Sequence, residues 1–217
     1  MYNAYIMQIS EIFYSIQGEG PNIGKPSIFL RLQGCHLRCV WCDSKFTWDF
    51  KSGKKMTTEE VIKELKKYPG KNLVITGGEP LIQQSALKEL LEKIGKNYYV
   101  EMETSGSLKS TLDKYINQYN CSPKTGNSKN KKIHLEKFPA EKTIYKFIID
   151  KKEDLEEIEE LIKKYRLPKD KILLMPQGIK KSELQKKSKW LIEICKEKNY
   201  RFSPRLHINI YSNQRGK

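Results

Sequence analysis

Short apolar runs alternate with longer amphipathic stretches along most of the chain, and this alternation constrains the fold more than any other feature. The apolar runs predict strands at residues 27–32, 72–76, 98–103, 143–149 and 171–175, with a last strand within 201–210. The amphipathic stretches predict helices at residues 57–68, 85–94, 108–119, 155–165 and 182–198. Strands that alternate with helices of about a dozen residues typically form right-handed βαβ units around a parallel sheet.

The predicted fold class is therefore α/β, as a partial β/α barrel with an open parallel sheet. A complete eight-stranded barrel typically needs ~250 residues, and this chain has 217. We expect one domain, residues 1–217, with functional groups at the carboxyl ends of the strands. Three polar motifs follow predicted strands, and they are Gly77-Gly78, Thr104-Ser105-Gly106 and Ser122-Pro123-Lys124.

Composition excludes some classes of protein. Hydrophobic residues make up 38% of the chain, and no apolar run approaches the ~20 residues of a membrane helix. Residues 1–10 lack the charged and apolar regions of a signal peptide, so we expect a cytoplasmic protein with no membrane partner. The net charge of +15 would attract polyanions, although Lys residues scattered over solvated helix faces give the same total. The densest basic segment, 124–137, is predicted to be a loop.

Cysteine spacing carries the strongest chemical signal. Five cysteines in a chain without an export signal argue against a disulfide framework. Three of them, Cys35, Cys39 and Cys42, fall within eight residues, so one short loop could bind a cluster through three thiolates. Zinc sites and simple ferredoxin clusters take four protein ligands, whereas three leave one iron open. The alternative is a zinc knuckle in which Cys121, Cys195 or, with more difficulty, His36 supplies the fourth ligand.

A second motif, Gly77-Gly78-Glu79-Pro80, follows an apolar strand about thirty-five residues after the cysteines. Two glycines allow a ligand to approach the backbone closely, and a carboxylate suits an ammonium group. With Cys-x3-Cys-x2-Cys, this motif resembles the radical S-adenosylmethionine (SAM) superfamily. The resemblance implies a [4Fe–4S] cluster on the three cysteines, SAM bound at the open iron, and hydrogen abstraction by a 5′-deoxyadenosyl radical.

Further motifs narrow the resemblance to the 7-carboxy-7-deazaguanine synthase family. They span nearly the whole chain, and they are 15–20, Gly24, 29–31, 42–49, 103–106, 122–124, 204–207 and 213–216. The family converts 6-carboxy-5,6,7,8-tetrahydropterin to 7-carboxy-7-deazaguanine with release of ammonia, for 7-deazapurine (queuosine) synthesis. The resemblance also implies Mg²⁺, a homodimer, and an electron donor such as flavodoxin or ferredoxin, without direct contact to nucleic acid.

The resemblance assigns roles to individual residues. SAM would contact Trp41, Asp43, Gly77, Gly78, Glu79, Gly106, Ser122, Pro123, Lys124 and Gln177. The pterin would contact Ile16, Gln17, Gly18, Arg31, Thr104 and Pro204. Arg31 suits a carboxylate because its guanidinium is a planar fork. Ser44 would bind Mg²⁺ through its hydroxyl where the family usually has Thr, with Asp43 or Thr47 as the alternative neighbour of the metal.

Two other functions would account for part of these features. A radical SAM activase, which makes a glycyl radical on a partner protein, would share the cysteine loop but not the Gln17-Gly18-Glu19-Gly20 segment or the 204–216 tail. A basic nucleic-acid-binding protein with a zinc knuckle would explain the charge and the cysteines, but not Gly77 to Pro80.

Overall fold

The protein folds around one curved sheet. A computed structural model describes residues 6–131 and 134–217. Residues 1–5, half of the segment that lacks signal-peptide features, and residues 132–133 of the basic segment lie outside the described residues. The strand order is β3-β1-β2-β4-β5-β6-β7-β8-β9. The strands are β1 (Ile6–Ile16), β2 (Pro26–Leu32), β3 (Lys54–Thr57), β4 (Asn72–Gly77), β5 (Tyr99–Thr104), β6 (Gln118–Cys121), β7 (Thr143–Ile149), β8 (Ile172–Pro176) and β9 (Arg201–Phe202).

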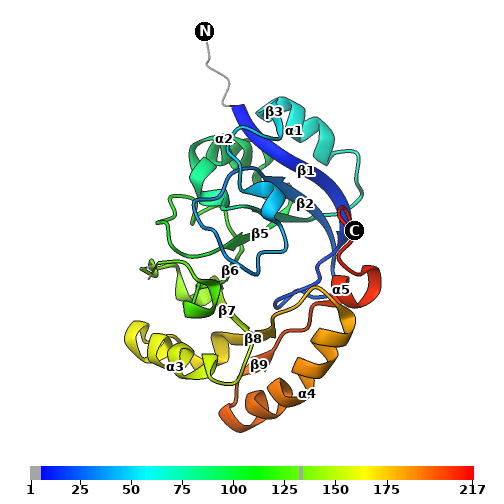
Figure 1. The fold of residues 1–217 in the computed structure, drawn as a ribbon. Coiled ribbons are helices and arrows are strands. Elements are labelled where there is room, and N and C mark those ends of the chain that lie inside the picture. The colour runs from blue at the N-terminus through cyan, green and yellow to red at the C-terminus, as the bar shows by residue number, and fades with distance from the viewer. Residues whose placement is uncertain (1–5, 132–133) are drawn as a thin grey trace.

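From β2 to β9 each strand runs parallel to its neighbour, while β1 pairs antiparallel with both β2 and β3. The sheet bends strongly, but its edge strands β3 and β9 are not paired with each other, which confirms the open, partial barrel (Figure 1). The helices are α1 (Thr58–Leu65), α2 (Gln84–Ile94), α3 (Asp154–Tyr165), α4 (Lys181–Lys198) and α5 (Leu206–Tyr211).

Most predicted elements are confirmed within a few residues. Helix α1 begins with the predicted capping box, because the Thr57 side chain accepts from Glu60 N while Glu60 accepts from Thr57 N. Strands β1 and β3 and helix α5 were not predicted. The last strand spans only Arg201–Phe202.

The helix predicted at residues 108–119 is wrong. Residues 108–117 form bends and turns, and β6 begins at Gln118. Asn117 exchanges hydrogen bonds with the backbone of Val100, which brings the segment to the edge of β5. The Tyr119 hydroxyl reaches Ser110 and Asp113 from within the sheet. These tertiary contacts replace the local hydrogen bonds of a helix.

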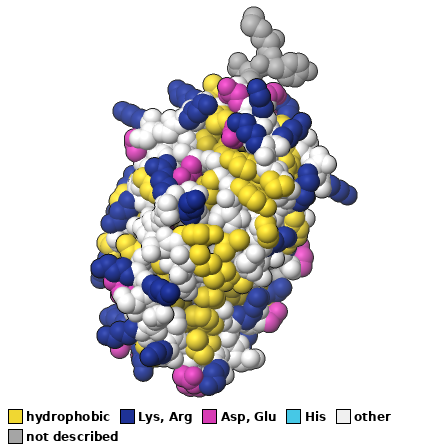
Figure 2. Space-filling view, turned by 90° about the vertical axis from the view of Figure 1, so that its right-hand side faces the viewer, with side chains coloured by type: hydrophobic (Ala, Val, Ile, Leu, Met, Phe, Trp, Pro, Cys, Tyr) yellow, Lys and Arg dark blue, Asp and Glu magenta, His cyan; other side chains and the backbone are white. Residues whose placement is uncertain are grey.

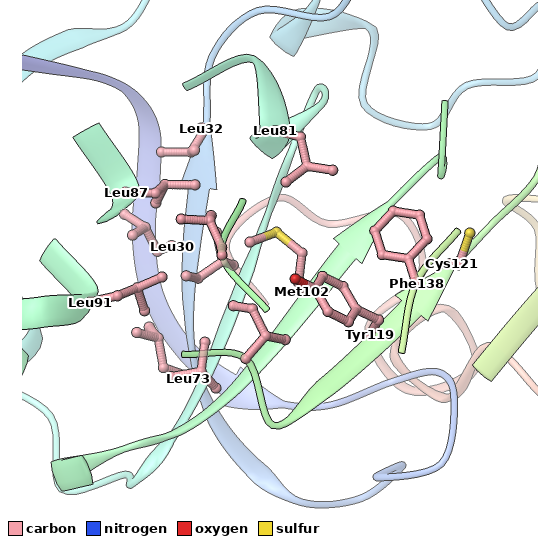
Figure 3. Packing of buried hydrophobic residues seen from close by; sticks show 14 of the residues in the cluster. Leu30, Leu32, Leu73, Leu81, Leu87, Leu91, Met102, Tyr119, Cys121 and Phe138 are labelled. Atoms are coloured by element: carbon pink, nitrogen blue, oxygen red, sulfur yellow. The ribbon is translucent and has the colours of Figure 1, made fainter. Parts of the chain in front are cut away.

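The main core lies between the outer face of the sheet and the helices. Leu30 and Leu32 of β2 and Leu73 of β4 face Leu87 and Leu91 of α2, and all five side chains are buried (Figure 3). Alternate residues of these strands thus face the helices, which leaves the other face of the sheet for a cavity.

One side of the molecule carries a band of hydrophobic side chains among many Lys and Arg residues (Figure 2). On elements at this side, Tyr14 of β1, Ile192 of α4 and Tyr211 of α5 are exposed. None of the helices in residues 6–131 and 134–217 is long and apolar enough to cross a membrane.

Candidate active site

A cavity of about 440 Å³ opens at the carboxyl edge of the parallel strands. The register of β2 with β4 pairs Leu32 with Gly77, so the loop that leaves β2 starts beside the loop that leaves β4. Sixteen predicted site residues line this cavity, and they are Ile16, Gln17, Gly18, Arg31, Cys35, Cys39, Trp41, Cys42, Asp43, Ser44, Gly77, Gly78, Thr104, Ser122, Lys124 and Gln177.

The cysteine loop forms one wall of the cavity. Cys35 and Cys39 are buried and Cys42 is half-buried, and they pack with Leu37, Trp41 and Trp48 in a small apolar cluster. Burial raises the pKa of the Cys35 thiol to about 11 and also raises that of Cys42. Iron would therefore have to displace protons from these thiols when it binds.

The donor set fits an iron–sulfur cluster better than zinc. Cys121 and Cys195, the candidate fourth ligands, are buried in the main core and do not line the cavity. His36 is exposed, and its ring bonds the Ser107 hydroxyl. In the described part of the chain, no three Cys, His, Asp or Glu side chains are grouped as ligands of one metal ion. A cluster binds each thiolate at a separate iron, so it does not need that convergence.

The Gly77-Gly78 motif packs directly against the start of the cysteine loop. A Cβ atom on Gly77, whose φ is +140°, would lie 2.2 Å from the Leu32 carbonyl oxygen. A Cβ on Gly78 would lie 2.2 Å from the Gly34 carbonyl oxygen and 2.8 Å from Cys35 Cβ. Only glycine lets the two strand ends approach this closely, so the motif positions the cysteine loop as well as opening a backbone surface to a ligand.

Glu79, a predicted contact of SAM, has its carboxylate engaged by neighbouring protein groups. Its carboxylate is buried and does not line the cavity. One oxygen accepts from the Thr104 hydroxyl at 2.8 Å, and the other accepts from Ser105 N at 2.9 Å and Ser105 Oγ at 2.5 Å. Because these donors occupy both oxygens, Glu79 joins the end of β4 to the end of β5.

Three other predicted site residues also lie outside the cavity lining. Gly106 packs under β6, where an added Cβ would lie 2.3 Å from Cys121 Sγ. Pro123 is buried between two cavity residues, Ser122 and Lys124. Pro204 lines a shallow depression beside α4 instead of the main cavity. Their predicted contacts with SAM and with the pterin stay predictions.

Aromatic and cationic groups line the part of the cavity next to the cysteines. Lys124 lies over the Trp41 ring, with Nζ 5.5 Å from its centroid, and donates to the carbonyl and hydroxyl oxygens of Ser122. Gln177 follows β8, and its side-chain oxygen accepts from Lys187. This corner thus combines a ring face, hydroxyl groups and a positive charge.

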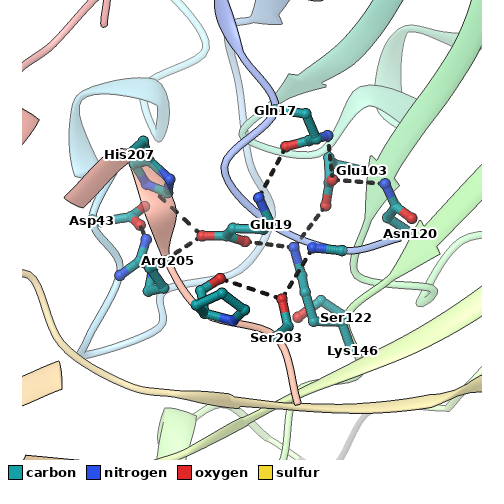
Figure 4. A network of polar contacts seen from close by, with 12 residues as sticks. Gln17, Glu19, Asp43, Glu103, Asn120, Ser122, Lys146, Ser203, Arg205 and His207 are labelled. Carbon is teal, nitrogen blue, oxygen red and sulfur yellow. Dashed lines mark hydrogen bonds and ion pairs between the residues drawn. The ribbon is translucent and has the colours of Figure 1, made fainter. Parts of the chain in front are cut away.

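A network of paired charges also lines the cavity (Figure 4). Lys146 of β7 is 3% exposed and contacts Glu19 at 2.5 Å and Glu103 of β5 at 3.0 Å. Arg205 pairs with the second oxygen of Glu19 at 2.9 Å and also with Asp43. This chain of ion pairs joins the loop after β1, the cysteine loop and the C-terminal segment.

The network shifts the acidity of its members in opposite directions. Burial alone would raise the pKa of Glu19, but Lys146 and Arg205 hold it well below its usual range. Burial raises the pKa of Glu103, and Lys146 only partly offsets that effect. Two carboxyl groups with different proton affinities therefore face the same cavity.

Arg31 shares a carboxylate with a second arginine. Its Nε and that of Arg215 lie 2.8 Å from the two oxygens of Glu11, and both guanidinium groups lie over the Phe46 ring. Residues 213–217 line the cavity as well. The tail therefore covers the Arg31 side of the cavity, where guanidinium nitrogens suit an anionic group.

Ser44 and Asp43 line the cavity, and Ser44 Oγ donates to Asp43 at 2.9 Å. Thr47 is buried instead, and its hydroxyl donates to the Ser44 carbonyl. Of the two hydroxyl groups considered for the metal, only that of Ser44 thus lies at the cavity among the described residues.

Sequence reasoning gave no role to Glu19, Glu103, Lys146 or Arg205. Glu19, Glu103 and Arg205 belong to quoted motifs, but nothing showed that they would be paired. Lys146 had a signal that was not used, since it is a lone charge inside the apolar run Thr143–Ile149. A Lys in a strand that is buried on both faces needs an acidic partner.

Comparison with known proteins agrees with this site. Residues 30–177 match the model of the radical SAM superfamily. The 7-carboxy-7-deazaguanine synthase of Pyrobaculum aerophilum is 38% identical over 217 residues, which cover 97% of both chains. That of Aquifex aeolicus is 35% identical over 206 residues, covering 93% of this chain and 92% of the relative.

Two solved structures share the fold of this chain. QueE from Escherichia coli superimposes with a TM-score of 0.74 at 29% identity, over 93% of this chain and 95% of that one. SuiB from Streptococcus suis shares the fold alone, with a TM-score of 0.54 at 15% identity over 82% of this chain and 50% of its own.

Fold, cysteine loop and family match together define a radical SAM enzyme. The three-cysteine loop and the Gly-Gly motif meet at one cavity at the carboxyl edge of a partial barrel. Within that class, the chain belongs to the 7-carboxy-7-deazaguanine synthase family.

Proposed function

We propose that this enzyme converts 6-carboxy-5,6,7,8-tetrahydropterin to 7-carboxy-7-deazaguanine with release of ammonia, and so serves 7-deazapurine synthesis. The observation that carries the proposal is one cavity lined both by the three cysteines and by the ion pairs of Lys146 and Arg205 with their carboxylates. A pterin carries a carboxylate and several ring nitrogens, and it needs both charged and polar partners.

The cysteines Cys35, Cys39 and Cys42 would hold the [4Fe–4S] cluster. When bound, the cluster and SAM supply the one-electron chemistry that generates the hydrogen-abstracting radical. Gly77 and Gly78 would present backbone to SAM, with Trp41 and Lys124 beside it.

Substrate would bind between the tail and the charge network. Arg31 would receive the pterin carboxylate through guanidinium nitrogens that Glu11 leaves available. Gln17 and Thr104 would orient the ring, since Gln17 is itself fixed by Glu101 and Glu103. Glu103, whose pKa is raised, is suited to hold or release a proton at its carboxylate near the ring.

We also propose that Mg²⁺ binds at the Ser44 hydroxyl, next to the Asp43 carboxylate. Both groups provide the hard oxygen atoms that this ion prefers, and both line the cavity.

The remaining proposals concern the whole enzyme. We propose that it acts in the cytoplasm as a single domain over residues 1–217, receives electrons from a protein such as flavodoxin or ferredoxin, and forms a homodimer. The exposed hydrophobic band in Figure 2 supports association with a second copy. We expect no direct role for nucleic acid, because the substrate is a small molecule.

A product assay tests the reaction. The protein is reconstituted anaerobically with iron and sulfide, then incubated with dithionite, SAM, Mg²⁺ and 6-carboxytetrahydropterin, and analysed by mass spectrometry. We expect 7-carboxy-7-deazaguanine without net consumption of SAM. Cleavage of SAM without this product would reject the proposed substrate and favour the activase alternative. Single Cys-to-Ala variants at the three proposed ligands should lose the cluster, and a full iron content in any of them would reject that ligand.

A further inference from the structure

The basic segment that follows β6 lies against the cysteine loop. Val40 N donates to the Ser128 carbonyl at 3.1 Å, and Trp41 Nε1 donates to Asn127 Oδ1 at 3.1 Å. Asn127 is itself fixed by Asp154 and by the Ile148 carbonyl. Two contacts that do not involve the cysteine sulfurs therefore hold the middle of the loop in place.

Asn130 makes a third contact, which reaches a sulfur atom. Its Oδ1 accepts from Arg38 N at 2.8 Å, and its Nδ2 donates to Cys39 Sγ at 3.1 Å and to Ser128 Oγ at 3.1 Å. The backbone N–H of Arg38 can only donate, so it determines which end of the amide is oxygen. The NH₂ group must then face Cys39.

Backbone N–H groups already donate to the other two sulfurs, from Leu37 to Cys35 and from Ser44 to Cys42, and the Trp48 side chain of the same loop also donates to Cys42. Cys39 instead receives its hydrogen bond from a side chain that lies 91 residues further along the chain. A backbone donor is present whatever the residue, whereas this side-chain donor depends on the residue at position 130.

We propose that Asn130 is a positioning residue that tunes the reduction potential of the cluster through its hydrogen bond to the Cys39 sulfur. Reduction adds one electron from the external donor and one negative charge to the cluster and its thiolates. An N–H group aimed at a thiolate stabilises that added charge, and hydrogen bonds to the sulfurs are among the factors that set cluster potentials. Asn130 thereby favours the reduced form, which must be reached before SAM is cleaved.

An anaerobic redox titration of the reconstituted protein, followed by electron paramagnetic resonance without SAM or substrate, tests this inference. We expect Asn130→Ala to lower the equilibrium constant for reduction about tenfold, which equals about 59 mV for a one-electron couple. Asn130→Asp should also lower it, because the carboxylate keeps the acceptor for Arg38 N but loses the donor to Cys39.

Ser128→Ala is the matched control, since Ser128 contacts the same amide but no cysteine sulfur. The cluster of this variant should have the same reduction potential as that of the wild type. An unchanged potential in an iron-replete Asn130→Ala variant would overturn the inference, and so would an equal shift in Ser128→Ala. Failure of both Asn130 variants to take up iron would also overturn it, because Asn130 would then be needed to form the site.

The inference rests on the proposed cluster ligation, but its readout is separate from turnover. If the wild-type protein takes up iron and shows a measurable reduction potential but makes no product, the proposed substrate is rejected. The redox titration of the Asn130 variants then still tests the role of Asn130. A wild-type protein that takes up no cluster would reject both.

Discussion

Glu19 is the residue that links the two cations of the buried network. Each of its carboxylate oxygens contacts a different cation, Lys146 on one side and Arg205 on the other. Each cation also has a second acidic partner, which is Glu103 for Lys146 and Asp43 for Arg205. Removing the Glu19 charge would leave two buried cations with one carboxylate each, and buried charges are costly when they are under-paired.

We therefore expect Glu19→Gln to lower the free energy of unfolding by about 3 kcal/mol, near the low end of the range for breaking a buried pair. Urea unfolding of the purified protein measures this. The control is Glu193→Gln, which removes an exposed pair with Lys196 and should change stability by no more than about 0.5 kcal/mol. Equal changes in the free energy of unfolding for the two variants would show that the buried network contributes little to stability.

Glu19 should also make the stability of the protein depend on pH. The pKa of Glu19 in the folded protein lies well below its ordinary value of 4.5, with Lys146, Arg205, His207 and Glu103 around it. Its contribution to stability is thus fully present above about pH 4.5 and is lost as pH falls through the folded pKa.

The stability difference between wild type and Glu19→Gln should consequently be largest above about pH 4.5 and shrink at lower pH. Denaturant unfolding of both proteins across this range measures the difference. A gap that stays constant or widens on acidification would contradict the assignment of the lowered pKa to Glu19.

The proposed Mg²⁺ site can be tested by changing single residues. We expect Ser44→Ala to require a higher Mg²⁺ concentration for full activity, by roughly tenfold, because one oxygen ligand is lost. Ser44→Thr should keep the wild-type response. Thr47→Val should lower stability without changing the Mg²⁺ dependence, and a changed dependence in that variant would instead make Thr47 the ligand.

At the scale of elements, the site depends on how closely two strand ends approach. Strand β2 leads into the cysteine loop and β4 into the Gly-Gly motif, and Gly78 N and Glu79 N donate to the Leu32 and Gly34 carbonyl groups. Backbone hydrogen bonds thus attach the start of the cysteine loop to the neighbouring strand.

We expect Gly78→Ala to displace the cysteine loop, because its Cβ would lie 2.2 Å from a backbone oxygen. Overpacking of this kind costs about 1–3 kcal/mol, and iron content after reconstitution should fall with it. Gly126→Ala is the control, since its Cβ would meet the carboxylate end of the Glu157 side chain, at 3.1 Å, and no backbone atom within 4 Å is among its nearest neighbours. Full iron uptake by Gly78→Ala would show that the loop tolerates the shift.

At the scale of the molecule, curvature lets one cavity collect groups from most of the sheet. Residues from β1, β2, β4, β5, β7 and β8 line it, together with the C-terminal tail. The net charge of the chain is +15, and Lys and Arg side chains are scattered over the face that Figure 2 shows.

Binding to tRNA should accordingly be weak and electrostatic. Fluorescence anisotropy should show binding that is mostly lost between about 50 and 200 mM salt, and an unrelated RNA of equal length should bind equally well. Tight binding that resists salt and prefers tRNA would contradict a role confined to the small-molecule step.

The sequence predicted features whose cause is local. Buried strands such as Ile172–Pro176 are apolar runs, and α1 begins at its capping box, so neighbouring residues are enough to predict them. Residues 108–119 have a helical pattern but lie in turns and a strand, because contacts with β5 outweigh a weak local preference.

The sequence by itself determined the superfamily and the family, because each of the motifs that carry them, from the cysteine loop to the C-terminal tail, is made of residues close together in the chain. Only the tertiary structure decided which motif residues face the cavity, turned Glu79 into a link between strands, and paired Lys146 with Glu19 across 127 residues. Burial and charge pairing depend on which residues folding brings into contact. Residues far apart in the chain can be such neighbours, and the local sequence pattern does not show which ones are.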